Sequence, residues 1–222
     1  MRKFVSLKSI IAVKSAANSP IYKSRQTGSV LTEPVFVQLR KLYMEMKFKI
    51  LTVLFFSILL SGEIKETALN QIKDFYKKGV KIVEHKFSIS KEVKKEIQNK
   101  VNQGFFRDKV YYWTINKEGS TDYAIMDNVI GKSMPITFIV IFNSEGLIIH
   151  SSIVKYREGY GGEVRNQSWL SQFNGMAQDS LYIFNRDIAG ISGATISVKS
   201  VTKGMNKLSL LAPYIIKNHE SK

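Results

Sequence analysis

The sequence predicts an α+β fold: an antiparallel sheet with flanking helices, forming a single domain after an N-terminal signal or anchor. Helical spacing of apolar residues occurs before and after the middle of the chain, whereas the middle consists of strand-like runs broken by turn residues. Strands segregated from helices are typical of α+β domains. A hydrophobic content of 44% with 11% aromatic residues is enough to bury a core.

The helices and strands are predicted in the following order. A first helix covers residues 63–78, with apolar residues at helical spacing: Ile64, Ala68, Leu69, Ile72, Phe75 and Tyr76. A second covers residues 90–101 and begins with the capping sequence SKEV. Two hairpins follow, which turn at residues 117–119 and 143–146.

The last third of the chain mixes loops and helices. A glycine-rich loop, EGYGGEV, covers residues 158–164. A short helix at 166–175 and a strand-like SLYIFN at 180–185 follow. A long helix at 195–217 completes the domain, with one apolar face formed by Val198, Val201, Met205, Leu208 and Leu211.

Composition excludes several classes of function. There is no cysteine, so disulfides, thiolate catalysis and iron–sulfur clusters are excluded. The three histidines are far apart in the sequence and have no ligand-like spacing, which predicts no metal site. About half of the net charge of +15 lies in residues 1–49, and elsewhere lysine and glutamate alternate as on a solvated helix face. We therefore expect no nucleic-acid binding.

The stretch MKFKILTVLFFSILLSG at residues 46–62 has the anatomy of a signal peptide or membrane anchor. Two lysines precede a run of eleven residues that is apolar except for Thr52 and Ser57, and small residues follow it. A buried core helix is the alternative. With a signal or anchor at residues 46–62, residues 1–45 are expected to be an over-extended or disordered leader. Residues 63–104 are expected to form a helical N-terminal segment, and residues 105–217 the main domain.

The sequence SGAT at residues 192–195 consists of small residues and lies where the last helix is predicted to begin. A helix start carries unpaired backbone N–H groups and a partial positive charge, which favour a phosphate. Gly193 and Ala194 would let an anion approach, and the hydroxyls of Ser192, Thr195 and Ser197 would add donors. An ordinary N-cap explains the same residues, since serine and threonine are common caps.

SGAT followed by a helix resembles the flavinylation motif of the FMN-binding domain family, which includes the C subunit of sodium-pumping NADH:quinone oxidoreductase and the G subunit of the Rnf complex. The stretch YREGYGGEVRNQSWLSQFNG at 156–175 is similar to a second motif of that family. The resemblance implies FMN esterified to Thr195, with Ser192, Gly193 and Ala194 beneath its phosphate. It places Glu158, Tyr160, Gly161 and Gly162 along the flavin and makes residues 105–217 the FMN-binding domain.

One position departs from the family pattern. Members usually have an acidic residue three positions before the motif serine, where this chain has Ala189. Asp187, two residues earlier, is the nearest carboxylate that could replace it. FMN held without the ester is the alternative if that carboxylate is needed.

The function expected from the resemblance is an exported FMN protein that relays electrons between membrane redox partners. Its partners would be a flavin transferase and membrane electron-transfer proteins, on the extracytoplasmic side of the membrane, with the protein membrane-associated or secreted. No catalytic acid–base pair is recognisable, so an electron carrier is favoured over a stand-alone reductase. The alternative from another class is an exported binding or assembly module of the same fold without flavin.

Overall fold

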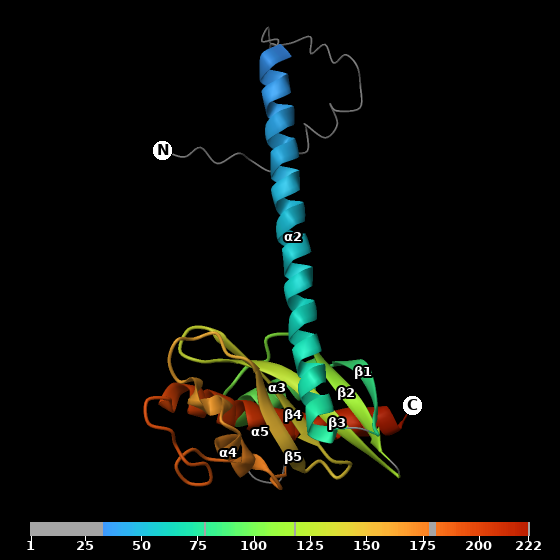
Figure 1. Cartoon of the computed structure of the whole chain (residues 1–222), viewed down its shortest axis with the longest axis vertical. Helices are drawn as coiled ribbons and strands as arrows, with labels where there is room; N and C mark the ends of the chain where they lie inside the picture. Colours follow the sequence, from blue (N-terminus) through green and yellow to red (C-terminus); the bar gives the residue numbers. More distant parts are fainter. Residues whose placement is uncertain (1–32, 78, 118, 178–180, 222) are drawn as a thin grey trace. The chain divides into compact units, whose positions relative to one another are not determined.

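A computed structural model describes residues 33–77, 79–117, 119–177 and 181–221 (Figure 1). Within the first helix it does not describe the side chains of residues 33–36, 38, 39 and 53–61. The chain divides into two units, Met1–Phe56 and Ser57–Lys222, which are treated separately below. Residues 1–32 of the predicted leader, and most apolar side chains of the predicted signal, lie outside the described residues, so both assignments stay predictions.

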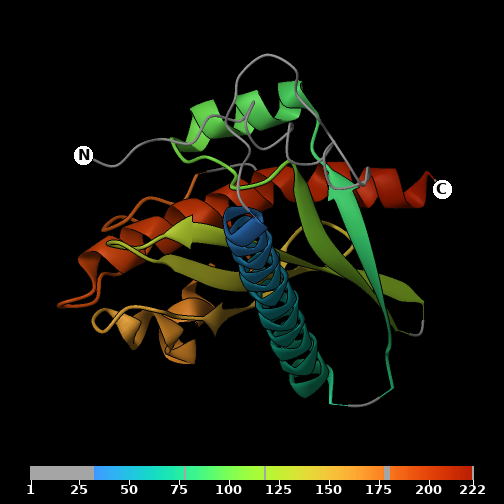
Figure 2. The ribbon, with the colours of Figure 1, turned by 90° about the horizontal axis from the view of Figure 1, so that it is seen from above.

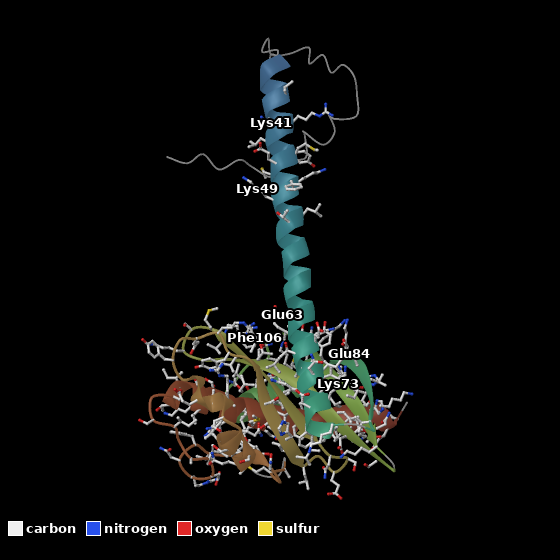
Figure 3. All side chains as sticks on the ribbon, in the orientation of Figure 1. Lys41, Lys49, Glu63, Lys73, Glu84 and Phe106 are labelled. Carbon is white, nitrogen blue, oxygen red and sulfur yellow. The ribbon has the colours of Figure 1, made fainter. Side chains whose placement is uncertain are left out.

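Helix α2 (Glu33–Tyr76) begins in the first unit. Seven of its large apolar side chains there are more than half exposed: Val37, Leu42, Met44, Met46, Phe48, Ile50 and Leu51. Basic side chains stand among them, including Lys41 and Lys49 (Figure 3). In the part of the chain that the structure describes, no helix is both long and apolar enough to cross a membrane.

The second unit contains one antiparallel sheet. Its strands are β1 (Lys81–Ser88), β2 (Lys109–Lys117), β3 (Ser120–Ile130), β4 (Pro135–Phe142) and β5 (Ile148–Lys155), and each pairs with the next along the chain. The pairs β2–β3 and β4–β5 are the two predicted hairpins. The antiparallel sheet and the α+β class are therefore confirmed.

Helices cover both faces of the sheet (Figures 1 and 2). Helix α5 (Thr195–Glu220) and helix α3 (Lys91–Val101) pack on one face, and Ala68 and Ile72 of α2 pack on the other. Side chains of β4 point alternately to the two sides, Phe138 toward α5 and Ile139 toward α2. Because both faces are covered, the strand is apolar at every position except Thr137 and does not alternate with polar residues.

Short helical turns follow β5 and lead toward α5. They are η1 (Gly162–Arg165), α4 (Gln167–Leu170) and η2 (Ser171–Phe173), the last two replacing the single short helix predicted at 166–175. The Asn166 side chain accepts from Ser168 N at the start of α4. Ser90 caps α3 by accepting from Val93 N, as SKEV predicts.

A strand was predicted at residues 180–185. The prediction is wrong for residues 181–185, which form no strand and only an isolated bridge from Phe184 to Ile188. The reason is a side chain on α5. Asn206 Oδ1 accepts from Tyr182 N at 2.8 Å, and Asn206 Nδ2 donates to Tyr182 O at 2.9 Å. Both backbone groups of Tyr182 are thus satisfied without a neighbouring strand.

Strand β1 was missed by the sequence analysis. It lies within the segment 63–104, which was expected to be helical, and pairs with β2 at the edge of the sheet. Its centre is polar, with Glu84, His85 and Lys86 in succession, as is common in edge strands. It also brings His85 within 5.2 Å of His219, measured between ring centroids, so two histidines that are far apart in the sequence are neighbours in the fold.

A buried ion pair joins the sheet to α5. Lys207 Nζ lies 2.7 Å from Asp127 Oδ2, and the lysine side chain is fully buried. The same ammonium donates to the carbonyls of Gly104 and Asn128, at 3.0 and 3.3 Å. Burial raises the pKa of Asp127, and the charge of Lys207 acts against this rise.

Candidate functional site

Helix α5 begins without a cap from any side chain. Its N-cap residue is Ala194, no side-chain hydrogen bond closes the first turn, and the first turn contains no acidic residue. The ordinary N-cap that the sequence left open is therefore not formed by Ser192 or Thr195. The first N–H groups of the helix have no intrahelical acceptors, so this end keeps its capacity for an anion.

The residues before and after Ala194 leave this helix start accessible. Gly193 has φ +78°, and a Cβ built on it would meet nothing within 4 Å. Ser192 and Thr195 are exposed, whereas Ala194 is buried against the core. The structure therefore places the hydroxyls of Ser192 and Thr195 at the surface, beside the open end of the helix.

The glycine-rich loop lies against the same helix start. A Cβ on Gly161 would come within 2.8 Å of both Ser197 Oγ and Tyr156 Oη, so only glycine allows this approach. Its φ of +79° is also a conformation that favours glycine. The two motifs, far apart in the sequence, are thus in direct contact at Gly161 and Ser197.

Ser197 differs from the other two hydroxyl residues. It is 3% exposed, and its Oγ lies 2.9 Å from the hydroxyl of Tyr156. Its side chain therefore connects the helix to the glycine-rich loop. Tyr156 was quoted with the second motif but was not assigned to the site.

Glu158 holds the turn between β3 and β4. Its Oε1 accepts from Ser133 N at 2.6 Å and from Met134 N at 2.8 Å. These backbone N–H groups lower the pKa of the carboxyl group, because they stabilise its charged form. A Cβ on Gly131 would lie 2.9 Å from the carboxylate, so a larger residue there would displace the Glu158 side chain.

The other two residues of the loop have different surroundings. Tyr160 is 90% exposed, and its carbonyl accepts a hydrogen bond from the Tyr156 hydroxyl. At Gly162 a Cβ would lie 3.1 Å from Nη2 of Arg165, whose Nε donates to the Gly162 carbonyl. Tyr160 thus presents an exposed aromatic side chain at the surface.

The segment 166–175 fixes the approach to the helix. Trp169 Nε1 donates to the carbonyl of Ala189 at 2.8 Å, and Ala189 N donates to Gln172 Oε1 at 2.8 Å. Both peptide groups of Ala189 are held, which fixes the loop that leads to Thr195. The sequence analysis quoted Trp169 and Gln172 but gave them no role, because their partner lies elsewhere in the chain.

Asp187, the nearest candidate for the missing acidic residue, has partners within its own turn. Its carboxylate accepts from Arg186 Nη2 at 2.9 Å and from Ile183 N at 2.8 Å. The hydrogen bond from Arg186 is the main cause that lowers its pKa. The charge of this carboxylate is therefore partly balanced where it lies.

Among the predicted site residues, Tyr160, Ser192 and Thr195 are exposed at the surface. The structure has a hollow of about 430 Å³ beside Tyr182, Arg186 and Asp187, and another of about 340 Å³ beside Leu69 and Lys73. No predicted site residue lines either of them. Within the described residues, no three histidine or acidic side chains gather as they would around a metal ion.

Comparison with known proteins identifies this region. No curated protein matches the chain. Residues 131–209 match a family model described as the FMN-binding domain. The matched segment begins at the turn held by Glu158, contains all nine predicted site residues and ends within α5. Residues 131–209 are thus similar to the FMN-binding domain family, the family that the two sequence motifs resemble.

Proposed function

We propose that this protein carries FMN with its phosphate at the start of helix α5. The observation that carries the proposal is the uncapped helix start, with the glycine-rich loop packed against it. Ser192, Gly193, Ala194 and Thr195 would surround the phosphate, whose negative charge suits the unpaired N–H groups. The open space at Gly193 and the absence of an acidic residue in the first helical turn fit this group.

Thr195 would hold the phosphate covalently. In this reaction the bond between Thr195 Oγ and the FMN phosphorus forms while a phosphoanhydride bond in an activated FMN donor breaks. The donor's leaving group departs, and the hydroxyl proton passes to a base of the flavin transferase. The chain gains one FMN less one water, and no oxidation or reduction takes place. The exposure of Thr195 supports the proposal, because a transferase must reach its hydroxyl.

The function proposed for the loaded protein is electron relay. FMN supplies one- and two-electron chemistry when bound, and the protein supplies anchoring and orientation. The ring would lie toward the loop of Glu158, Tyr160, Gly161 and Gly162. The exposure of Tyr160 and Thr195 suits an electron carrier, since a redox partner must come close to the ring.

We further propose that the protein is exported and works at the extracytoplasmic side of a membrane, with membrane electron-transfer proteins as partners. The exposed apolar residues of α2, with lysines among them, support contact with lipid. An ester bond would be useful there, because a small cofactor that dissociates outside the cytoplasm is lost.

A binding or assembly module without flavin is the second candidate, and Ala189 is the observation that favours it. Its side chain carries no carboxylate, and Asp187 is engaged with Arg186. If the transferase needs an acidic residue at position 189, Thr195 would stay unmodified. The domain could then bind a partner through the same surface.

Intact mass separates these candidates. The full chain is expressed with a flavin transferase in an export-competent host, beside Thr195→Ala and Thr195→Ser variants. We expect a gain of one FMN less one water in the wild type, none in Thr195→Ala and a partial gain in Thr195→Ser. A colourless wild-type protein without added mass would favour the module. A yellow protein without added mass would mean FMN held without the ester.

A further inference from the structure

Tyr156 lies directly after strand β5, between the two motifs of the site. Its hydroxyl donates to the carbonyl of Tyr160 in the glycine-rich loop. The same oxygen lies 2.9 Å from Ser197 Oγ in the first turn of α5. One half-buried side chain therefore touches both the loop and the helix start.

The direction of these hydrogen bonds follows from proton counting. A phenol has a single proton, and a carbonyl oxygen can only accept. Since the proton of Tyr156 goes to Tyr160 O, Ser197 must donate its own proton to Tyr156 Oη. The buried Ser197 hydroxyl thus serves the link between loop and helix, which leaves Thr195 and Ser192 as the hydroxyls at the surface.

The surroundings keep this link in one arrangement. Gly161 lets the loop backbone approach both hydroxyls, where a Cβ would lie only 2.8 Å from each. The guanidinium of Arg165 lies 5.7 Å from the centre of the Tyr156 ring. Its Nε also donates to the Gly162 carbonyl at 3.1 Å, so the ring and the loop share one cationic neighbour.

We propose that Tyr156 is a positioning residue of the FMN site, which sets the glycine-rich loop at a fixed place relative to the phosphate-binding helix start. The inference rests on the proposed function. A ligand with its phosphate at the helix and its ring at the loop needs both at a defined separation. A link that exists before binding lowers the entropy cost of ordering the loop.

The test uses the full chain without a transferase, so that FMN binding is reversible and flavin fluorescence measures it. The variants are Tyr156→Phe, Ser197→Ala and the double substitution. Tyr182→Phe is a matched control, because the Tyr182 hydroxyl also donates to a carbonyl, that of Ala177, and contacts an α5 serine, Ser209. Ser209 lies twelve residues beyond Ser197, about 18 Å along the helix.

We expect Tyr156→Phe and Ser197→Ala each to weaken FMN binding about three- to tenfold, the usual effect of losing one neutral hydrogen bond. The double variant should be no weaker than the worse single variant, because the two residues share one link. Tyr182→Phe should stay within about twofold of the wild type. Hydrogen exchange at residues 157–162 should rise in Tyr156→Phe and not in Tyr182→Phe.

Three results would overturn the inference: wild-type affinity in Tyr156→Phe, an equal loss in Tyr182→Phe, or additive losses in the double variant. Hydrogen exchange separates this failure from failure of the proposed function. If the wild type binds no FMN while the contrast in exchange is present, the proposed function fails. The positioning role then falls with it, and Tyr156 is only a structural link.

Discussion

Gly161→Ala tests whether the glycine-rich loop is held against helix α5 as the structure describes. The substitution adds one methyl group at a position with φ +79°. The new Cβ would lie 2.8 Å from Ser197 Oγ and from Tyr156 Oη, closer than a carbon and an oxygen approach without displacement. The variant therefore combines backbone strain with a steric clash.

The two effects can be given separate magnitudes. A non-glycine residue in the left-handed region costs about 1–2 kcal/mol. Inserting a methyl group into a packed contact costs about 1–3 kcal/mol more. Gly175→Ala is the matched control, since Gly175 also has φ +79° but its Cβ would meet nothing within 4 Å. We expect a loss of about 1–2 kcal/mol for Gly175→Ala and about 2–5 kcal/mol for Gly161→Ala.

Urea unfolding of the full chain without FMN measures both losses. The slope of the free energy with urea should be the same in both variants, so that the midpoints report stability alone. FMN binding should weaken in Gly161→Ala and stay unchanged in Gly175→Ala. Equal losses of stability in the two variants would refute the reasoning, because the close contact at Gly161 would then contribute nothing.

Four further predictions concern other contacts. Lys207→Met should lower the free energy of unfolding by about 3–5 kcal/mol, because it leaves Asp127 buried without its partner. Adding Asp127→Asn to this variant should recover part of the lost stability. If urea unfolding showed no recovery, the prediction would be contradicted. Because the pKa of Glu158 is lowered in the folded protein, its hydrogen bonds stabilise the fold at pH values above the pKa of an unfolded glutamate. This contribution to stability is lost as the pH falls through the pKa of Glu158 in the folded state. The amide signals of Ser133 and Met134 should therefore shift together at a pH below the ordinary glutamate range, and in Glu158→Gln they should not. Trp169→Phe should reduce the yield of the Thr195 ester, measured by intact mass, more than Trp113→Phe, whose indole lies in the core on the α2 side of the sheet. Ala189→Asp should raise that yield without changing stability, because Ala189 is exposed; an unchanged yield would mean that the transferase needs no carboxylate there.

The sequence predicted the four strands of the two hairpins, β2 to β5. β4, and residues 123–126 of β3, were recognisable because α5 and α2 cover the two sides of the sheet and favour apolar residues at successive positions. β1 was not, since its pairing with β2 stabilises an edge strand whose centre is polar. Its strand character comes from a neighbour in space, which local spacing does not report.

The opposite error occurred at residues 181–185. Leu181, Tyr182, Ile183 and Phe184 have the residue types of a strand. Asn206, on the last helix, binds both backbone groups of Tyr182 and replaces the partner strand. A contact over such a distance in the sequence leaves no signal near either residue.

The helix start was predicted from residue types and the loop residues from the resemblance to the family, but the partners of their side chains came only from the structure. The sequence offered Glu158 as a residue along the flavin, and its carboxylate in fact accepts from the turn at Ser133 and Met134. That role requires the turn from β3 to β4 to lie beside the loop after β5, which follows from the antiparallel pairing of β4 with β5. Contact with a flavin is a separate property of Glu158 and stays a prediction.

The orientation of helix α5 about its own axis gives the hydroxyls of residues 192–197 different surroundings. Thr195 and Ser197 are two residues apart, so they point in directions about 200° apart around the helix. Ala194, Val198 and Val201 are buried, and they fix which side faces the core. Ser197 lies on the core side and joins the loop through Tyr156, whereas Thr195 faces solvent. The sequence SGATIS contains all three hydroxyls, but only the packing of this helix decides that Ser197 is buried while Thr195, like Ser192, stays at the surface.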